Sequence, residues 1–145
     1  LLNTSQLLAQ NTLLQGKLNQ QYNTGITLIE HANYSAARMV LTEFISQADV
    51  YDMRRAEAAY YVAFAALNLG HSDGEKLIDQ FIMQYPGSAR AATAYFDLGV
   101  YFYQEKNYER SAYYFKKVNF PSLTSEQQYE GHFKPRAMHR VPGLP

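Results

Sequence analysis

The feature that most constrains the fold of this chain is a repeat with a period of 37 residues. The same step separates Gly25, Val62 and Gly99. It also relates three further columns, one of small and two of large apolar residues: Ala37, Gly74 and Ser111; Leu41, Ile78 and Phe115; Phe44, Phe81 and Val118. A fixed period of this size is typical of proteins built from stacked units that cover one another, so we expect a repeat architecture.

Each unit is predicted to be a helical hairpin. Within a unit the two small residues, such as Gly25 and Ala37, lie 12 positions apart, and apolar residues on either side follow the spacing of a helix face. Antiparallel helices approach closely only where side chains are small, so these positions mark the helix crossing. The pattern predicts helices near 17–31, 34–47, 52–69, 73–84, 88–104, 108–118 and 124–133.

Turn residues support these boundaries. Pro86 cannot continue a helix, whereas Ser88 can cap the next one. Asn and Gly residues between the paired helices favour turns. We therefore expect an N-terminal segment 1–16, a repeat domain 17–134 and a flexible tail 135–145. The repeat units are predicted at about 17–50, 51–87 and 88–123, with a partial fourth unit at 124–134.

Both ends depart from the repeat. Residues 1–16 are rich in leucine, with the small residue Ala9, which fits either the remnant of an export signal or an extra helix. At the other end, the step of 37 from Leu98 and Gly99 reaches Pro135 and Arg136, so the fourth unit is expected to stop early. An uncovered last unit predicts self-association.

Composition excludes several classes of function. Hydrophobic residues make up 47% of the chain, which indicates a packed core, and 13 Lys plus Arg balance 13 Asp plus Glu. Without a net positive field, nucleic acid is not an expected partner. The absence of cysteine excludes disulfides and thiolate sites, and no apolar stretch reaches the roughly 18 residues of a membrane span.

No catalytic constellation is visible in the sequence. The four histidines, His31, His71, His132 and His139, are scattered, and the chain contains no His-x-x-x-His pair, nucleophile elbow or phosphate-binding glycine loop. We therefore expect neither an enzyme nor a metal or cofactor site.

The third unit resembles the tetratricopeptide repeat pattern. The matching residues are Tyr95, Leu98, Gly99, Phe102, Ser111 and Phe115. The second unit keeps Tyr61, Gly74, Ile78 and Pro86, and the first keeps Gly25, Leu28, Ala37 and Leu41. The first unit departs at Gln21 and Thr24, and the period exceeds the usual value of about 34. The resemblance implies an all-α fold, an α-α superhelix of about three hairpins plus a partial fourth.

A narrower resemblance covers about residues 54–120. Phe81, Tyr85, Pro86 and Ser88, followed by the Ala94-Tyr95 pair, are similar to tetratricopeptide repeats of bacterial envelope proteins, of the outer-membrane assembly lipoprotein and Tol–Pal accessory types. This likeness implies a periplasmic or envelope location and a role in protein–protein interaction. A cytoplasmic location is the alternative.

In tetratricopeptide proteins the first helix of each unit faces a concave groove. The corresponding residues here are Tyr22, Ile26, Ala59, Ala63, Phe96, Val100 and Tyr103. This apolar and aromatic floor suits a peptide or amphipathic helix, and not the acidic tails that Lys and Asn would hold. We therefore expect a protein-binding scaffold. The alternatives are a structural or oligomerisation spacer of a longer repeat protein, and the helical part of a glycan-binding envelope protein.

Overall fold

A computed structural model describes residues 1–119, and this part of the chain is all-helical, without strands. Its helices are α1 (Thr4–Glu30), α2 (Tyr34–Gln47), α3 (Arg54–Asn68), α4 (Gly74–Gln84), α5 (Ala89–Gln104) and α6 (Tyr108–Phe115). The predicted all-α class is thereby confirmed. The helix predicted at 124–133, the partial fourth unit and the tail at 135–145 lie outside the described residues.

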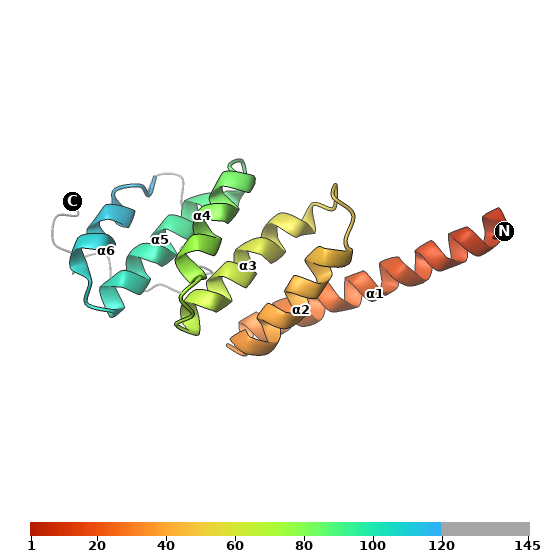
Figure 1. Cartoon of the computed structure of the whole chain (residues 1–145), viewed down its shortest axis with the longest axis horizontal. Helices are drawn as coiled ribbons and strands as arrows, with labels where there is room; N and C mark the ends of the chain where they lie inside the picture. The colour runs from red at the N-terminus through yellow and green to blue at the C-terminus, as the bar shows by residue number, and fades with distance from the viewer. Residues whose placement is uncertain (120–145) are drawn as a thin grey trace.

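The helices form three successive pairs, α1 with α2, α3 with α4 and α5 with α6, which follow one another along the long axis (Figure 1). Helix α3 contacts both helices of the first pair as well as α4 and α5. Each pair therefore covers its neighbour, as the repeat predicts. We call the junction between residues 4–47 and 54–84 the first seam, and that between 54–84 and 89–115 the second seam.

The three turns within the pairs share one backbone geometry. Each places a residue in the left-handed region: Ala32 (φ 55°), Gly70 (φ 68°) and Lys106 (φ 59°). The following amide donates to a carbonyl five residues back: Asn33 to Leu28 (2.8 Å), His71 to Ala66 (3.0 Å) and Asn107 to Phe102 (2.8 Å). This bond closes a Schellman motif. The repeat is therefore present in the backbone even where the sequence has no glycine.

The predicted crossing residues lie at close contacts between paired helices. A Cβ atom on Gly99 would come within 2.8 Å of the Phe115 ring, and one on Gly74 within 2.9 Å of the backbone nitrogen of Leu67. Gly25 faces Leu41 in the same way. The other small residues of the crossing columns, Ala37 and Ser111, are fully buried. Pro86 lies between α4 and α5, where the Ser88 hydroxyl accepts a bond from the Arg90 amide (3.2 Å).

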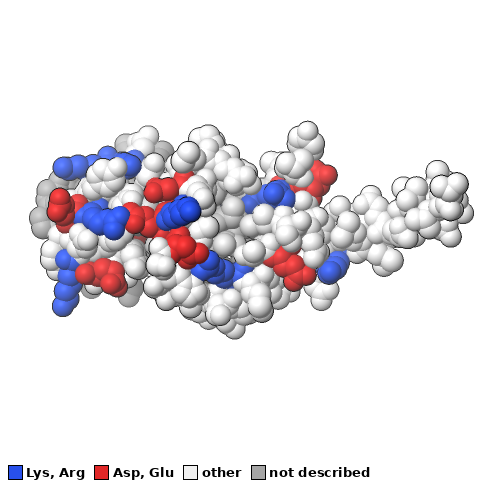
Figure 2. Space-filling view, in the orientation of Figure 1, with Lys and Arg blue, Asp and Glu red and all other residues white. Residues whose placement is uncertain are grey.

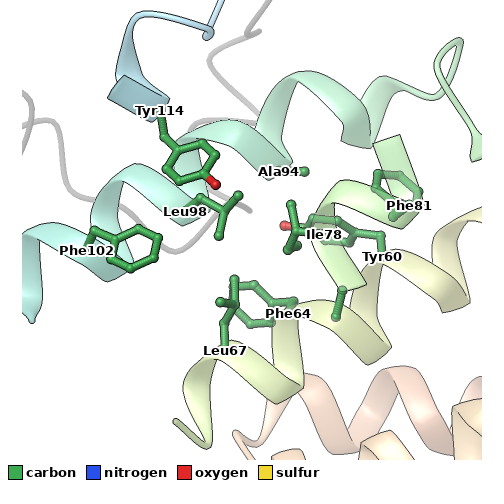
Figure 3. Close-up of a cluster of buried hydrophobic side chains, with 10 residues drawn as sticks. Tyr60, Phe64, Leu67, Ile78, Phe81, Ala94, Leu98, Phe102 and Tyr114 are labelled. Atoms are coloured by element: carbon green, nitrogen blue, oxygen red, sulfur yellow. The ribbon is translucent and has the colours of Figure 1, made fainter. Parts of the chain in front are cut away.

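The core runs through the pairs without interruption. Side chains of α3, α4, α5 and α6 interlock in one cluster (Figure 3): Tyr60, Phe64, Leu67, Ile78, Phe81, Ala94, Leu98, Phe102 and Tyr114. A second cluster joins α1, α2 and α3 around Leu41 and Phe44. Tyr34 packs against both clusters. Aromatic rings therefore fill the space between units, as expected for stacked hairpins.

Helix α1 is longer than the predicted span 17–31. It begins at Thr4, because Asn3 and Gln6 form a reciprocal capping box with bonds of 2.9 and 3.1 Å. Residues 4–16 thus continue the first helix without a turn, projecting from the pairs (Figure 1). Leu8 and Leu13 on this projection are 67% and 74% exposed. Within residues 1–119 no helix has the length and apolarity that a membrane span requires.

Helix α6 is shorter than the predicted span 108–118. It ends at Phe115, and the amides of Lys117 and Val118 bond to carbonyls three residues back, which tightens the chain into a turn. Val118 is nevertheless buried, beside Phe96 and Phe115. The apolar column that includes Val118 therefore extends past the end of the helix.

Candidate functional site

Two of the seven predicted groove residues are in the core. Ala63 and Phe96 are fully buried, and the Phe96 ring lies edge-on to that of Phe115, with centroids 5.1 Å apart. Neither side chain therefore offers surface to a partner in this structure. The physical reason is that helix α6 packs closely on α5 at Gly99, which brings the Phe115 ring beside the neighbouring turn of α5.

The other five predicted residues are half-buried, and two of them are engaged within the chain. The Tyr22 hydroxyl donates to Glu57 (2.8 Å), and the Tyr22 ring packs on Phe44. The Tyr103 ring packs edge-on against Tyr108, with centroids 5.4 Å apart. Ile26, Ala59 and Val100 complete the set. Binding of a partner by these five residues remains a prediction.

A polar row links the first helices of the three pairs. Glu57 of α3 accepts from Tyr22 of α1, and it also accepts from Arg90 of α5 at 3.0 Å. Arg90 donates to the Tyr61 hydroxyl as well, at 2.7 Å. On the face shown in Figure 2, basic and acidic side chains alternate, and the projecting part of α1 carries neither. No single-sign patch dominates this face.

A pocket of about 350 Å³ lies between α3 and α5, in the second seam. We call it the α3/α5 pocket. Its lining residues are Phe64, Leu67, Asn68, Leu69, Gly70, Asp97, Val100, Tyr101, Gln104 and Glu105. Val100 is the one predicted groove residue among them. The structure therefore moves the candidate site from a broad groove to a pocket at one seam.

Asp97 is the most buried polar group in this lining. It is 7% exposed, and the Tyr60 hydroxyl donates to its Oδ2 at 2.5 Å. Within residues 1–119, no other hydrogen bond to this carboxyl is formed. Burial raises the pKa of Asp97 to about 8, although the Tyr60 bond and the positive charge of Arg90 act to lower it. At neutral pH the unliganded carboxyl is therefore mainly protonated.

The repeat relates the residues of this seam to those of the first. Tyr60 precedes Asp97 by one period of 37, and the two residues meet within the second seam, where the Tyr60 hydroxyl donates to Asp97. In the first seam, Tyr34 also packs edge-on against Phe64, with centroids 5.8 Å apart. The counterpart of Tyr34 is His71, which is exposed and contacts Arg38 at 2.5 Å. The Tyr34 ring of the first seam is therefore replaced in the second by an exposed histidine.

The charge around the pocket favours a positive ligand. Its described lining contains two carboxyl groups, Asp97 and Glu105, and no Lys, Arg or His. The lining also includes the C-terminal residues of α3 and α5, Asn68 and Gln104, where helix dipoles place partial negative charge. The guanidinium of Arg90 is bonded to Glu57 and Tyr61.

The described residues show no metal site: none of residues 1–119 belongs to a group of three His, Asp or Glu placed to hold an ion. His71 contacts Arg38, and His31 contacts the carbonyl of Thr27 (2.8 Å). Neither histidine lines the α3/α5 pocket. The described lining of the pocket combines carboxyl, amide and tyrosine hydroxyl groups with apolar side chains.

Comparison with known proteins adds no relative. No protein-family model matches the chain, and neither the curated proteins nor the solved structures include a significant match. The function has to be argued from the residues and the geometry of this chain.

Proposed function

We propose that this chain is a non-catalytic, tetratricopeptide-like repeat scaffold that binds a segment of a partner protein. The shared turns, the small residues at the helix crossings and the pairwise stacking support this proposal. A superhelical arrangement and an envelope location belong to the same proposal, and they rest on the resemblance of the sequence. Cytoplasmic location is the alternative.

The observation that carries the proposal is the α3/α5 pocket beside Val100. Its volume of about 350 Å³ is at the lower end of the range for ligand sites, about 300 to 1,000 Å³. Such a pocket suits one long side chain better than a whole small molecule. In protein interfaces, a few side chains buried in pockets commonly supply most of the binding energy. The partner segment is therefore proposed to insert one anchor residue between α3 and α5.

A peptide-display selection tests this proposal. Peptides selected on the purified chain should lose at least about tenfold in affinity when Gln104→Trp fills the mouth of the pocket. Gln80→Trp is the matched control, because Gln80 is also exposed and helical but lies on α4, outside the pocket lining. Equal affinity of the selected peptides for both variants and the parent would reject the pocket as the binding site.

A second candidate function, an oligomerisation module, is favoured by the projecting half of α1. Leu7, Leu8, Leu13 and Leu14 are exposed there on an uncharged stretch. A mass that rises with concentration, and that returns to the monomer value in a Leu8→Gln, Leu13→Gln double variant, would support this function.

Self-association through the last unit concerns residues outside the described part. The described residues add nothing in favour of glycan binding.

A further inference from the structure

We infer that the α3/α5 pocket recognises a basic side chain, lysine or arginine, of the partner segment, with the Asp97 carboxylate as its counterion. This inference rests on the proposed function, because it names the chemistry of the anchor residue. It assigns a ligand class to a carboxyl group that lines the pocket and is held by the Tyr60 hydroxyl.

The shape of the pocket fits such a side chain. Phe64, Leu67 and Val100 provide apolar surface, along which the methylene stem of a lysine or arginine can lie. The ring of Tyr101, also in the lining, can stack on a guanidinium or face an ammonium group. Long basic side chains bury their stems in this way while the charge meets a polar group.

The polar groups are placed to receive the charge. Asp97 is held by the Tyr60 hydroxyl through Oδ2, and it contributes to the pocket surface despite its burial. Glu105, in the exposed part of the lining, adds a second carboxylate. The Tyr60 bond satisfies one oxygen of the carboxyl, and a cation in the pocket would give its ionised form a charged partner. A neutral apolar anchor has no charge to offer.

The titratable and charged groups around Asp97 determine how the site depends on pH. Tyr60 and Tyr61 belong to α3, Arg90 and Tyr101 belong to α5, and Glu105 directly follows α5. The Arg90 guanidinium donates to Glu57 and Tyr61 and lies over the Tyr60 ring, 5.3 Å from its centroid. Burial raises the pKa of Asp97 to about 8, so its proton state changes as the pH approaches this value.

A bound cation stabilises the ionised carboxylate, so binding releases one proton wherever the free carboxyl is protonated. The sign follows by linkage: below about pH 8 the affinity rises by about tenfold per pH unit, and above it the affinity levels off. A neutral side chain in the same pocket has no such dependence. The pH profile therefore separates recognition of charge from simple apolar filling.

The test uses two small probes on the full chain. N-acetyl-lysine N-methylamide and its norleucine analogue share the stem and differ in the ammonium group. Titration is followed by the methyl NMR signals of Val100 and Leu67 at pH 6, 7 and 8.5. The lysine probe should bind in the millimolar range, at least fivefold tighter than the norleucine probe at pH 8.5, and tenfold more weakly at pH 6 than at pH 7. An arginine probe should follow the same profile.

Asp97→Asn keeps an acceptor for the Tyr60 hydroxyl while removing the charge. It should abolish the difference between the two probes and the pH dependence. Asp79→Asn, on α4 and outside the pocket lining, is the matched control. Glu105→Gln, an exposed change that leaves the core intact, should weaken the lysine probe about two- to threefold. Equal binding of both probes to the parent, or a lysine profile that Asp97→Asn leaves unchanged, would overturn the inference.

The two proposals fail in different ways. If selected peptides depend on Gln104 but contain no basic anchor, partner binding at the pocket stands and the inference about charge falls. If the lysine probe binds as described while no selected peptide responds to Gln104→Trp, the cation site stands alone. In that case the pocket is rejected as the place where a partner segment is anchored.

Discussion

The two seams of this molecule are built from the same repeat but differ in what fills them. In the first seam, the rings of Tyr34 and Phe64 meet edge to face. In the second seam, the residues one period after these two are His71 and Tyr101, and the buried Tyr60 ring lies there, bonded to Asp97. Both seams contain aromatic rings, and the second also holds a pocket of about 350 Å³.

This difference shows how a repeat acquires a site. The columns of small and large apolar residues keep the same packing within each pair, from Gly25 to Gly99. A departure in one column, from Tyr34 to His71, leaves the helices paired and removes one ring from the contact between neighbouring pairs. Local departures from an otherwise consistent pattern are where functional sites are expected. Four predictions, ordered from the largest effect to the smallest, test this comparison.

Removing the buried Tyr60 ring from the second seam should have the largest effect. Tyr60→Ala deletes a fully buried side chain and leaves Asp97 without its hydroxyl partner. We expect a loss of about 3 to 5 kcal/mol in the free energy of unfolding, measured by urea denaturation. Tyr51→Ala is the control, since Tyr51 is 89% exposed and should change stability by less than about 0.5 kcal/mol. Similar losses in both variants would contradict the assigned core.

Stability should also depend on the small residue at the helix crossing within a pair. Gly99→Leu forces a side chain against the Phe115 ring, and we expect a loss of about 1 to 3 kcal/mol or more. Lys116→Leu, an exposed change at the end of α6, serves as the control. If thermal unfolding ranks Lys116→Leu as the more damaging change, the assigned crossing face is wrong.

The buried carboxyl of the second seam should make stability depend on pH. Burial raises the folded-state pKa of Asp97 to about 8, above the unfolded value near 3.8. Between these two pKa values, Asp97 is protonated in the folded state and ionised in the unfolded state. The free energy of unfolding therefore falls as the pH rises toward 8. Between pH 6 and 8 the parent should lose roughly 2 kcal/mol that Asp97→Asn does not lose. Parallel stability profiles of parent and variant in urea titrations would show that Asp97 is not buried as described.

Adding a ring to the second seam should make it resemble the first. His71→Tyr places an aromatic side chain one period after Tyr34, where it can meet Tyr101. We expect a gain of up to about 1 kcal/mol in unfolding free energy, and at least threefold weaker binding of the lysine probe. Urea denaturation and the NMR titration measure the two effects. His31→Tyr, at the exposed end of α1, should produce neither.

The fold was predictable because period and side-chain size encode it directly. The step of 37 through Gly25 and Gly99 located the crossings, and the turn residues located the paired helices. The extension of α1 was less accessible, since Thr4 to Gly16 contain no turn signal and the repeat gives no information outside its own units. The left-handed turns at Ala32 and Lys106 were also hidden, because glycine marks this conformation in one unit of three.

The candidate site was less predictable than the fold. The prediction that Phe96 lies in a groove used only its position along its own helix. Its burial depends on the ring of Phe115, which belongs to the neighbouring helix α6. Asp97 did carry a signal in the sequence: a single acidic residue within the apolar run from Ala94 to Tyr103, one period after Tyr60. Periodicity alone cannot show that two such residues form a hydrogen bond, because that depends on how neighbouring units stack.

The most direct test of this account is the titration of the Asp97 carboxyl carbon by ¹³C NMR, with and without the lysine probe. The account predicts a pKa near 8 in the free protein, because burial opposes the charge. With the probe bound, the same pKa should fall by at least one unit. A carboxyl that titrates below pH 5 in the free protein, or a pKa that the probe leaves unchanged, would contradict the claim that the second seam holds a buried acid for a cation.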